Sequence, residues 1–91
     1  MERKNYPPLL YKTGDKVRVK QLDYNGSYCM RSGKFAGQDI CPTRAMCNLS
    51  GQVVTIERAD GCYYVKEDPD KWNWADDMFE PVSPFLSNNL L

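Results

Sequence analysis

The chain has 91 residues, of which 42% are hydrophobic and 26% are charged, so it suits one small domain with a single core. Its Lys and Arg balance its Asp and Glu, and a pI near 6.2 argues against a protein that binds nucleic acid mainly through excess positive charge. It has no histidine, which excludes histidine acid–base catalysis and any zinc site with a histidine ligand.

Residues 1–11 form a polar N-terminal arm that contains the pair Pro7-Pro8, and we expect it to become ordered near Leu9. The arm lacks the apolar stretch of a secretion signal, and the chain has no run of roughly eighteen apolar residues that could span a membrane. We therefore expect a cytoplasmic protein without a membrane partner.

Residues 16–20 (Lys-Val-Arg-Val-Lys) alternate between polar and apolar, which predicts a strand with Val17 and Val19 on its buried face. Its cations belong to an uneven charge distribution. Residues 1–44 hold nine Lys or Arg and four Asp or Glu, whereas residues 45–91 hold three and eight. Two interpretations stay open: complementary charges on neighbouring strands, or a basic face that binds single-stranded nucleic acid together with aromatic side chains.

Residues 21–37, which we call the excursion loop, show no strand pattern and are rich in Gly, Ser, Asn and Asp. The segment is too long for a hairpin turn and too aromatic for a disordered linker. Long loops in compact domains are often functional, so its aromatic residues are candidates for a binding rim. The alternative is that Tyr24 and Tyr28 pack back onto the end of the β domain.

Residues 41–47 predict one or two helical turns, with Pro42 in the first turn and Ala45 and Met46 facing the domain. The strongest strand pattern follows at residues 52–58, where Val54 and Ile56 should face the core. The pair Asp60-Gly61 then supplies a tight turn to a returning strand at residues 62–67.

The last part of the chain predicts a short strand around Trp72 and Trp74, a helical turn at residues 75–78 and a closing strand at 79–82. Residues 83–91 look like a tail anchored only by Phe85 and Leu86. This order of elements predicts an all-β fold, a five-stranded SH3-like barrel over residues 12–82 with a long loop after the first strand.

The two tryptophans lie two residues apart, so on a strand they would point to the same face. They could both join the core or both form a patch with Tyr63 or Tyr64 for a proline-rich or extended peptide. Because strand twist separates neighbours in a small barrel, we expect one tryptophan to be deeply buried and the other partly exposed. Met78 and Phe79 are expected in the core.

Four stretches carry a resemblance to a known group: residues 14–19 (Gly-Asp-Lys-Val-Arg-Val), 49–56, 64–68 and 72–80 (Trp-Asn-Trp-Ala-Asp-Asp-Met-Phe-Glu). Over residues 12–82 the chain resembles small uncharacterised proteins of phages and prophages of Gram-positive bacteria. In order and spacing it is also similar to the SH3-like repeats of mind-bomb-type proteins, which bind peptides of other proteins. The resemblance implies the barrel fold, a phage or mobile-element origin and a non-enzymatic role.

Catalytic and metal chemistry find little support. Adjacent Asp76 and Asp77 in a helical turn diverge, and such residues more often bind nearby backbone N–H groups as turn or cap residues. The cysteines follow the spacing C-x11-C-x5-C-x14-C, which lacks the close pairs of a four-cysteine zinc site. In a reducing cytosol we expect free thiols that mainly serve as small core residues. We predict no enzyme activity, no cofactor and no metal.

We therefore predict a protein-binding module, with the inhibition of a bacterial host protein such as a defence nuclease as its concrete form. The alternative is single-stranded nucleic-acid binding by the basic first strand and the aromatic loop. The candidate binding residues are the exposed aromatic and basic side chains of the excursion loop, one tyrosine of the returning strand and one tryptophan: Tyr24, Tyr28, Arg31, Lys34, Phe35, Tyr63 and Trp72.

Overall fold

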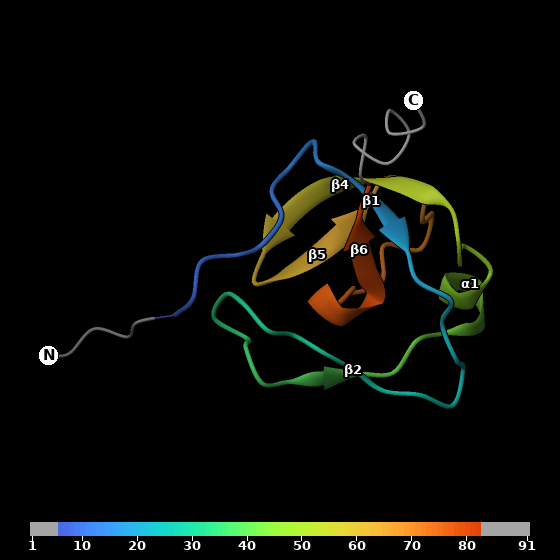
Figure 1. Cartoon of the computed structure of the whole chain (residues 1–91), viewed down its shortest axis with the longest axis horizontal. Helices are drawn as coiled ribbons and strands as arrows, with labels where there is room; N and C mark the ends of the chain where they lie inside the picture. The colour runs from blue at the N-terminus through green and yellow to red at the C-terminus, as the bar shows by residue number, and fades with distance from the viewer. Residues whose placement is uncertain (1–5, 83–91) are drawn as a thin grey trace, which may run out of the picture.

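The structure is a computed structural model that describes residues 6–82. Within this range four strands form one antiparallel sheet in the order β5-β4-β1-β6. They are β1 (Lys16–Val19), β4 (Val53–Asp60), β5 (Cys62–Val65) and β6 (Phe79–Pro81). Strand β4 pairs with β1 through its first half and with β5 through its second half, and it curves across the domain to do so (Figure 1).

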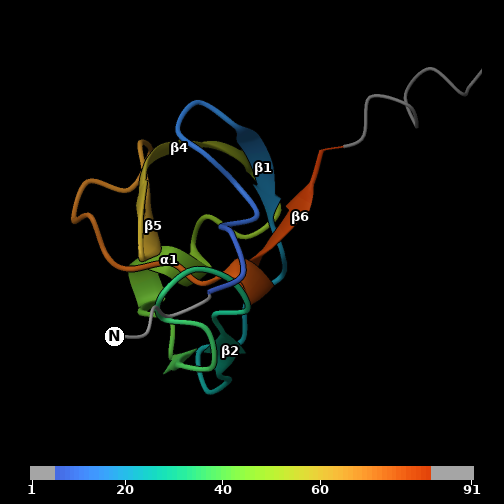
Figure 2. The ribbon, with the colours of Figure 1, turned by 90° about the vertical axis from the view of Figure 1, so that its left-hand side faces the viewer.

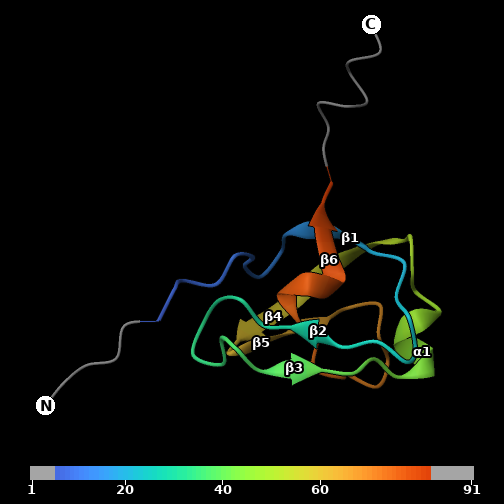
Figure 3. The same ribbon diagram turned by 60° about the horizontal axis from the view of Figure 1, so that its bottom comes forward.

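The segment between β1 and β4 contains a second sheet, in which β2 (Tyr28–Cys29) pairs with β3 (Asp39–Ile40). We call residues 28–40 the excursion hairpin. It packs against the 3-10 turn η1 (Asp76–Met78), lies below the main sheet in Figure 1 and comes in front of β4 and β5 in Figure 3. Helix α1 (Arg44–Cys47) follows the hairpin and lies at one end of the domain, at the right in Figure 1 and therefore on the far side in Figure 2.

The core lies between the main sheet and the segments beneath it. Trp74 is fully buried and stacks on Phe79 with ring centroids 5.5 Å apart, and Tyr63 meets Phe79 edge-on at 5.9 Å. The predicted inward residues of β1 and β4 are buried, as are Met46, Met78 and Phe79. Trp72 is 44% exposed, which confirms that one tryptophan is buried and the other partly exposed.

A buried carboxylate places Trp74. Asp68 is 1% exposed, and its Oδ2 accepts hydrogen bonds from the Trp74 indole Nε1 at 3.0 Å and from the Trp72 backbone nitrogen at 2.8 Å. Its Oδ1 accepts from the Asp70 nitrogen at 3.0 Å. The loop after β5 is therefore shaped around this carboxylate, because a buried charge must be hydrogen-bonded to remain buried.

Several predicted elements differ from the structure. Trp72 and Trp74 do not share a strand, since only Trp74 pairs, in a single bridge to Tyr63, and the Asp68 turn directs Trp72 outward. The helix is shorter than predicted, because Pro42 precedes the N-cap Thr43, and Ala45 is exposed.

The other differences concern the excursion loop and the ends of the chain. The excursion loop contains β2, which pairs with β3 just beyond the end of the loop, and the polar composition of the loop concealed this ladder. The predicted tail, residues 83–91, lies outside the described residues, as do residues 1–5 of the N-terminal arm. What the structure describes is a small, mostly β domain.

Replacing Trp74 by Phe removes the indole N–H that Asp68 accepts and leaves unfilled volume in the core. We expect Trp74→Phe to lower the free energy of unfolding by about 2 kcal/mol or more. The matched change Trp72→Phe, at a half-exposed position, should cost less than about 0.5 kcal/mol. Urea denaturation of both variants measures the difference, and equal losses would contradict the assigned role of Asp68 and Trp74.

Candidate functional site

The site is built around the buried carboxylate of Asp76 in η1, which is 4% exposed. Tyr63 donates its hydroxyl hydrogen to Asp76 Oδ1 at 2.6 Å, and Ser32 donates to Oδ2 at 2.9 Å. The backbone N–H of Arg31 donates to Oδ2 at 2.6 Å. Hydroxyl and amide donors thus stabilise the carboxylate in place of water, and they join the excursion hairpin, β5 and η1 at one point.

The neighbouring Asp77 fastens the outside of the same hairpin. The guanidinium of Arg31 forms a bidentate salt bridge with the Asp77 carboxylate, with Nε 2.7 Å from Oδ1 and Nη2 2.9 Å from Oδ2. The hydrogen bonds and the charge of Arg31 lower the pKa of the Asp77 carboxyl below its usual value. We predicted that Asp76 and Asp77 accept hydrogen bonds from nearby backbone N–H groups in their own turn. They accept from the backbone N–H groups of Arg31 and Cys29, which lie more than forty positions away.

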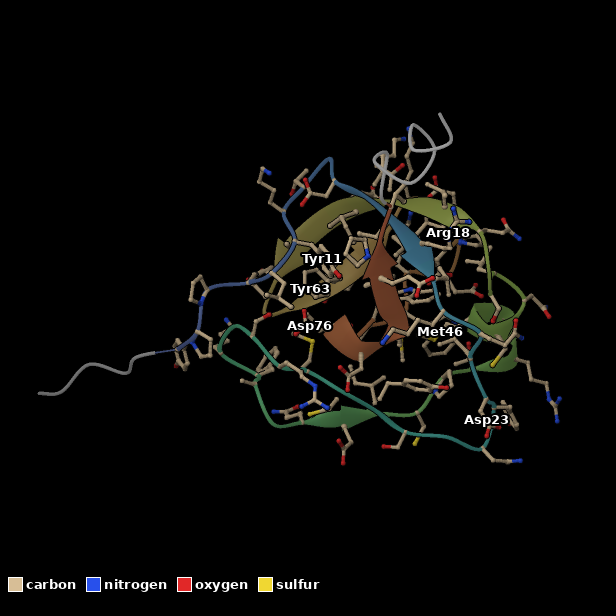
Figure 4. The ribbon with its side chains drawn as sticks, viewed as in Figure 1. Tyr11, Arg18, Asp23, Met46, Tyr63 and Asp76 are labelled. Carbon is tan, nitrogen blue, oxygen red and sulfur yellow. The ribbon has the colours of Figure 1, made fainter. Side chains whose placement is uncertain are left out.

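The N-terminal arm is attached to the same network. The Leu10 nitrogen donates to both Tyr63 Oη at 3.1 Å and Ser32 Oγ at 3.2 Å. Tyr11 packs edge-on against Tyr63, with centroids 5.6 Å apart, and Figure 4 shows both rings above Asp76. Because Asp76 takes the hydroxyl hydrogens of Tyr63 and Ser32, their oxygens are free to accept the arm's N–H groups. The arm is therefore ordered as expected near Leu9, and its anchor is a polar network.

The predicted binding residues of the excursion loop fall into two groups. At the end near α1, Tyr24 is 46% exposed, the Arg44 guanidinium lies 4.1 Å from its ring centroid, and the Tyr28 hydroxyl accepts from the Asp23 nitrogen. At the tip of the hairpin, Lys34 lies over the ring of Phe35 at 5.5 Å. Arg31, whose side chain is 63% exposed, lies between the groups along the chain, and we call this set of residues the outer edge of the excursion hairpin and loop.

The two other predicted binding residues do not belong to this surface. Tyr63 is fully buried, so its predicted role in surface binding is wrong: the β5 register directs its ring into the core and its hydroxyl to Asp76. Trp72 is exposed, but it extends from the loop after β5. The Tyr63 ring is part of the core, and its hydroxyl meets Asp76, Ser32 and the arm. Trp72 is separate from the excursion loop along the chain.

The tip of the hairpin is held close to the β4–β5 turn. An added Cβ at Gly61 would lie 2.5 Å from Phe35 Cε2, and one at Gly33 would lie 2.6 Å from Leu9 Cδ2. Both glycines have positive φ, +86° and +74°, a backbone conformation that residues other than glycine rarely adopt. The two glycines therefore let Phe35 and Leu9 approach the backbone directly.

A hollow of about 240 Å³ lies beside β4 and β5, lined by Glu57, Arg58, Tyr64 and Lys71. Lys71 Nζ pairs with Glu57 at 2.6 Å, and the Arg58 guanidinium lies 4.9 Å from the Tyr64 ring centroid. The charges that line this hollow thus already have partners within it. It offers no converging set of free polar groups for a small ligand.

The four cysteines form no disulfide, and only Cys62 is buried; Cys29 and Cys47 are half-buried and Cys41 is exposed. Burial raises the pKa of the Cys62 thiol, which disfavours its nucleophilic form. Cys41 is thus not the core residue that we predicted. Among residues 6–82, no three Cys, Asp or Glu side chains converge to hold a metal ion, and no helix is long and apolar enough to cross a membrane.

Sequence reasoning missed Ser32, Gly33 and the central role of Asp76. A serine and a glycine inside a polar loop carry no periodic signal, and an aspartate in a helical turn suggests a local cap. The pair Pro7-Pro8 followed by two leucines was the one available signal that the arm holds a definite place. Comparisons of the chain with family models, with curated proteins and with solved structures gave no match.

The change Asp76→Asn replaces one acceptor oxygen by an NH2 group that faces the donors of Arg31, Ser32 or Tyr63. We expect a loss of about 2–3 kcal/mol in the free energy of unfolding and faster amide hydrogen exchange at residues 29–33. The matched change Asp77→Asn weakens the ion pair with the exposed Arg31 guanidinium and keeps an amide oxygen that can accept from the Cys29 nitrogen, so it should cost less than about 1 kcal/mol. Similar costs for the two variants would contradict the central role of Asp76.

Burial, and then the hydrogen bond to Asp76, raise the pKa of Tyr63 from its usual value of 10.0 to about 12. The unfolded chain therefore loses this proton near pH 10, whereas the folded chain keeps it until about pH 12. The stability that depends on this group is complete below pH 10 and declines as the pH rises to 12. Denaturation across this range should show the decline, and Tyr63→Phe should remove most of its slope; an unchanged slope would refute the assignment.

Proposed function

We propose that the protein is a non-enzymatic protein-binding module that acts through the outer edge of its excursion hairpin and loop. One observation carries the proposal: Asp76 and Asp77 fix the hairpin to the domain from inside and from outside. A loop fastened in this way presents its exposed side chains in one arrangement. Binding then costs less conformational entropy than it would for a mobile loop.

The residues of this edge have the chemistry of a protein contact. Tyrosine and arginine are enriched where proteins bind one another, and the Tyr24–Arg44 pair is exposed and stacked. At the tip Lys34 is exposed and lies over the ring of Phe35, which is half-buried against Gly61. The Tyr24–Arg44 pair lies near α1 and the Lys34–Phe35 pair lies at the tip of the hairpin, so a partner that spans both would cover the hairpin.

The fold that we propose is an SH3-like barrel. The strand order β6-β1-β4-β5, continued by the Tyr63–Trp74 bridge, and a 3-10 turn directly before the last strand support this architecture. With it we propose the phage or mobile-element origin that the resemblance implies. The partner would then be a protein of the bacterial host cell, and the inhibition of a defence nuclease is the concrete form of that role.

The charges of β1 favour protein over nucleic acid as the partner. Lys16 shares Thr55 with Glu67, since Thr55 Oγ1 contacts both side chains, at 2.9 and 3.2 Å. Arg18 lies opposite Glu80 in the β1–β6 register and donates to the Gly51 carbonyl. Acidic neighbours on both sides thus weaken the attraction of this strand for phosphate groups.

The test is affinity capture from the lysate of a Gram-positive host, followed by titration of the identified protein against purified variants. We expect Tyr24→Ala combined with Arg44→Ala, or Lys34→Glu, to weaken binding at least tenfold while thermal unfolding stays unchanged. Trp72→Ala is the matched control, because it removes an exposed aromatic side chain outside the excursion loop and hairpin.

Two outcomes would contradict the proposal. Loss of binding in Trp72→Ala but not in the excursion variants would place the surface elsewhere. Salt-dependent retention of the protein on single-stranded DNA, in the absence of any captured protein, would favour the nucleic-acid alternative.

A further inference from the structure

The N-terminal arm occupies a groove in the manner of a bound peptide. The Gly33 N–H donates to the Pro7 carbonyl at 2.7 Å, the Leu9 side chain lies on the bare backbone of Gly33, and the Leu10 N–H reaches Ser32 and Tyr63. These contacts join the arm to the excursion hairpin and to β5 through residues more than twenty positions away. We call the surface formed by Ser32, Gly33 and the Tyr63 hydroxyl the arm groove.

The arm is held by these contacts and by Tyr11, whose nitrogen donates to Tyr63 Oη at 3.4 Å and whose ring packs on Tyr63 and Phe79, and not by a strand ladder. Residues 6–9 have no regular secondary structure, and Tyr6, Pro7 and Pro8 are exposed. Leu10 turns its side chain to solvent and is 62% exposed, so only its N–H engages the groove. Consecutive prolines favour an extended polyproline conformation, which lowers the entropy lost when such a segment binds.

We propose that the arm groove is a receptor site for an extended segment of a partner protein, and that the arm covers the site until that segment replaces it. This inference rests on the proposed protein-binding function and adds the chemistry of the bound segment. A segment that replaces the arm must offer a carbonyl to Gly33, an aliphatic side chain two residues later and an N–H one residue after that. Because every residue offers a carbonyl, the required pattern is two residues of any kind, an aliphatic residue, and then any residue except proline, which has no N–H; prolines at the first two positions favour the extended conformation.

The groove is prepared for such a segment by groups that do not need the arm for their own support. Asp76 orients the Ser32 and Tyr63 hydroxyls through hydrogen bonds of 2.9 and 2.6 Å, so their oxygens point to the same N–H. Gly33 has no Cβ, which leaves room for the leucine side chain, and its positive φ of +74° disfavours any other residue there. A partner segment would gain the contacts of the arm without any rearrangement of the hairpin.

A partner segment must compete with the arm, which is covalently attached to the same chain. The arm is joined to β1 by the short turn at residues 12–15, so its effective concentration at the groove is at least in the millimolar range of short linkers, and a free peptide binds the closed protein with reduced apparent affinity. Loosening the arm removes that competition. The full chain with Leu9→Asp achieves this, because the aspartate loses the aliphatic contact with Gly33 and places a charge where leucine packs on the backbone.

The experiment titrates a fluorescein-labelled peptide Tyr-Pro-Pro-Leu-Leu-Tyr, the sequence of residues 6–11, against the full chain and its Leu9→Asp variant by fluorescence anisotropy. We expect the variant to bind the peptide at least tenfold more tightly than the unaltered chain does. The matched control peptide Tyr-Pro-Pro-Leu-Pro-Tyr, which lacks the N–H that Ser32 and Tyr63 accept, should bind the variant at least tenfold more weakly. Ser32→Ala in the Leu9→Asp background should weaken the first peptide severalfold.

Equal binding of the two peptides, or no binding to a Leu9→Asp variant whose near-ultraviolet circular dichroism is unchanged, would overturn the inference. Concentration-dependent dimers of the unaltered chain that Leu9→Asp abolishes would show that a second copy's arm is the occupant, and would overturn it too. The same experiments distinguish failure of the arm groove from failure of the proposed function. A captured partner that depends on Tyr24 and Arg44 would uphold the outer edge even if the peptide did not bind, and peptide binding without such a partner would uphold the groove alone.

Discussion

The buried carboxylate of Asp76 determines how the irregular half of this domain is arranged. It accepts hydrogen bonds from Tyr63, Ser32 and the Arg31 backbone, and through the first two it governs the place of Leu10 in the arm. A hydrophobic contact could hold these segments together but could not fix their register, because it has no direction. A charged acceptor at a buried position requires donors at defined places, and two segments distant in sequence, residues 31–32 and Tyr63, supply them.

Asp68 plays a corresponding role on the other side of the domain. It fixes the loop after β5 by accepting from the Trp74 indole and from two backbone nitrogens. Both aspartates are almost fully buried, and both hold a segment without regular secondary structure. The sheet thus supplies the apolar surface, while two carboxylates direct the long connections. In a domain with a single small core, such polar anchors order segments that hydrophobic burial alone would leave loose.

The regular parts of the fold follow from patterns that the sequence displays. The alternation in residues 16–20, the β-branched run at 52–58 and the turn at Asp60-Gly61 predicted β1, β4 and β5, and the structure confirms them. The irregular parts could not be predicted in the same way. The Ser32 hydroxyl, the bare backbone of Gly33 and the Asp76 carboxylate acquire their roles only when distant segments meet, and no local pattern encodes such a meeting. For the same reason Tyr63 looked like a surface residue, since adjacent Tyr63 and Tyr64 reveal their faces only once the β4–β5 register is known.

The Asp76 network also links the two surfaces proposed for binding. The outer edge of the excursion hairpin and the arm groove are opposite sides of the same few residues, since Arg31 meets Asp77 outside while its own N–H and the neighbouring Ser32 meet Asp76 inside. When one segment replaces another in the groove, Ser32 and Tyr63 accept a hydrogen bond from a different N–H group, but they keep their own bonds to Asp76. The hairpin therefore keeps its position when the occupant of the groove changes. The outer edge can remain formed whether the arm or a partner segment lies in the groove, so the two surfaces could contact one partner at the same time.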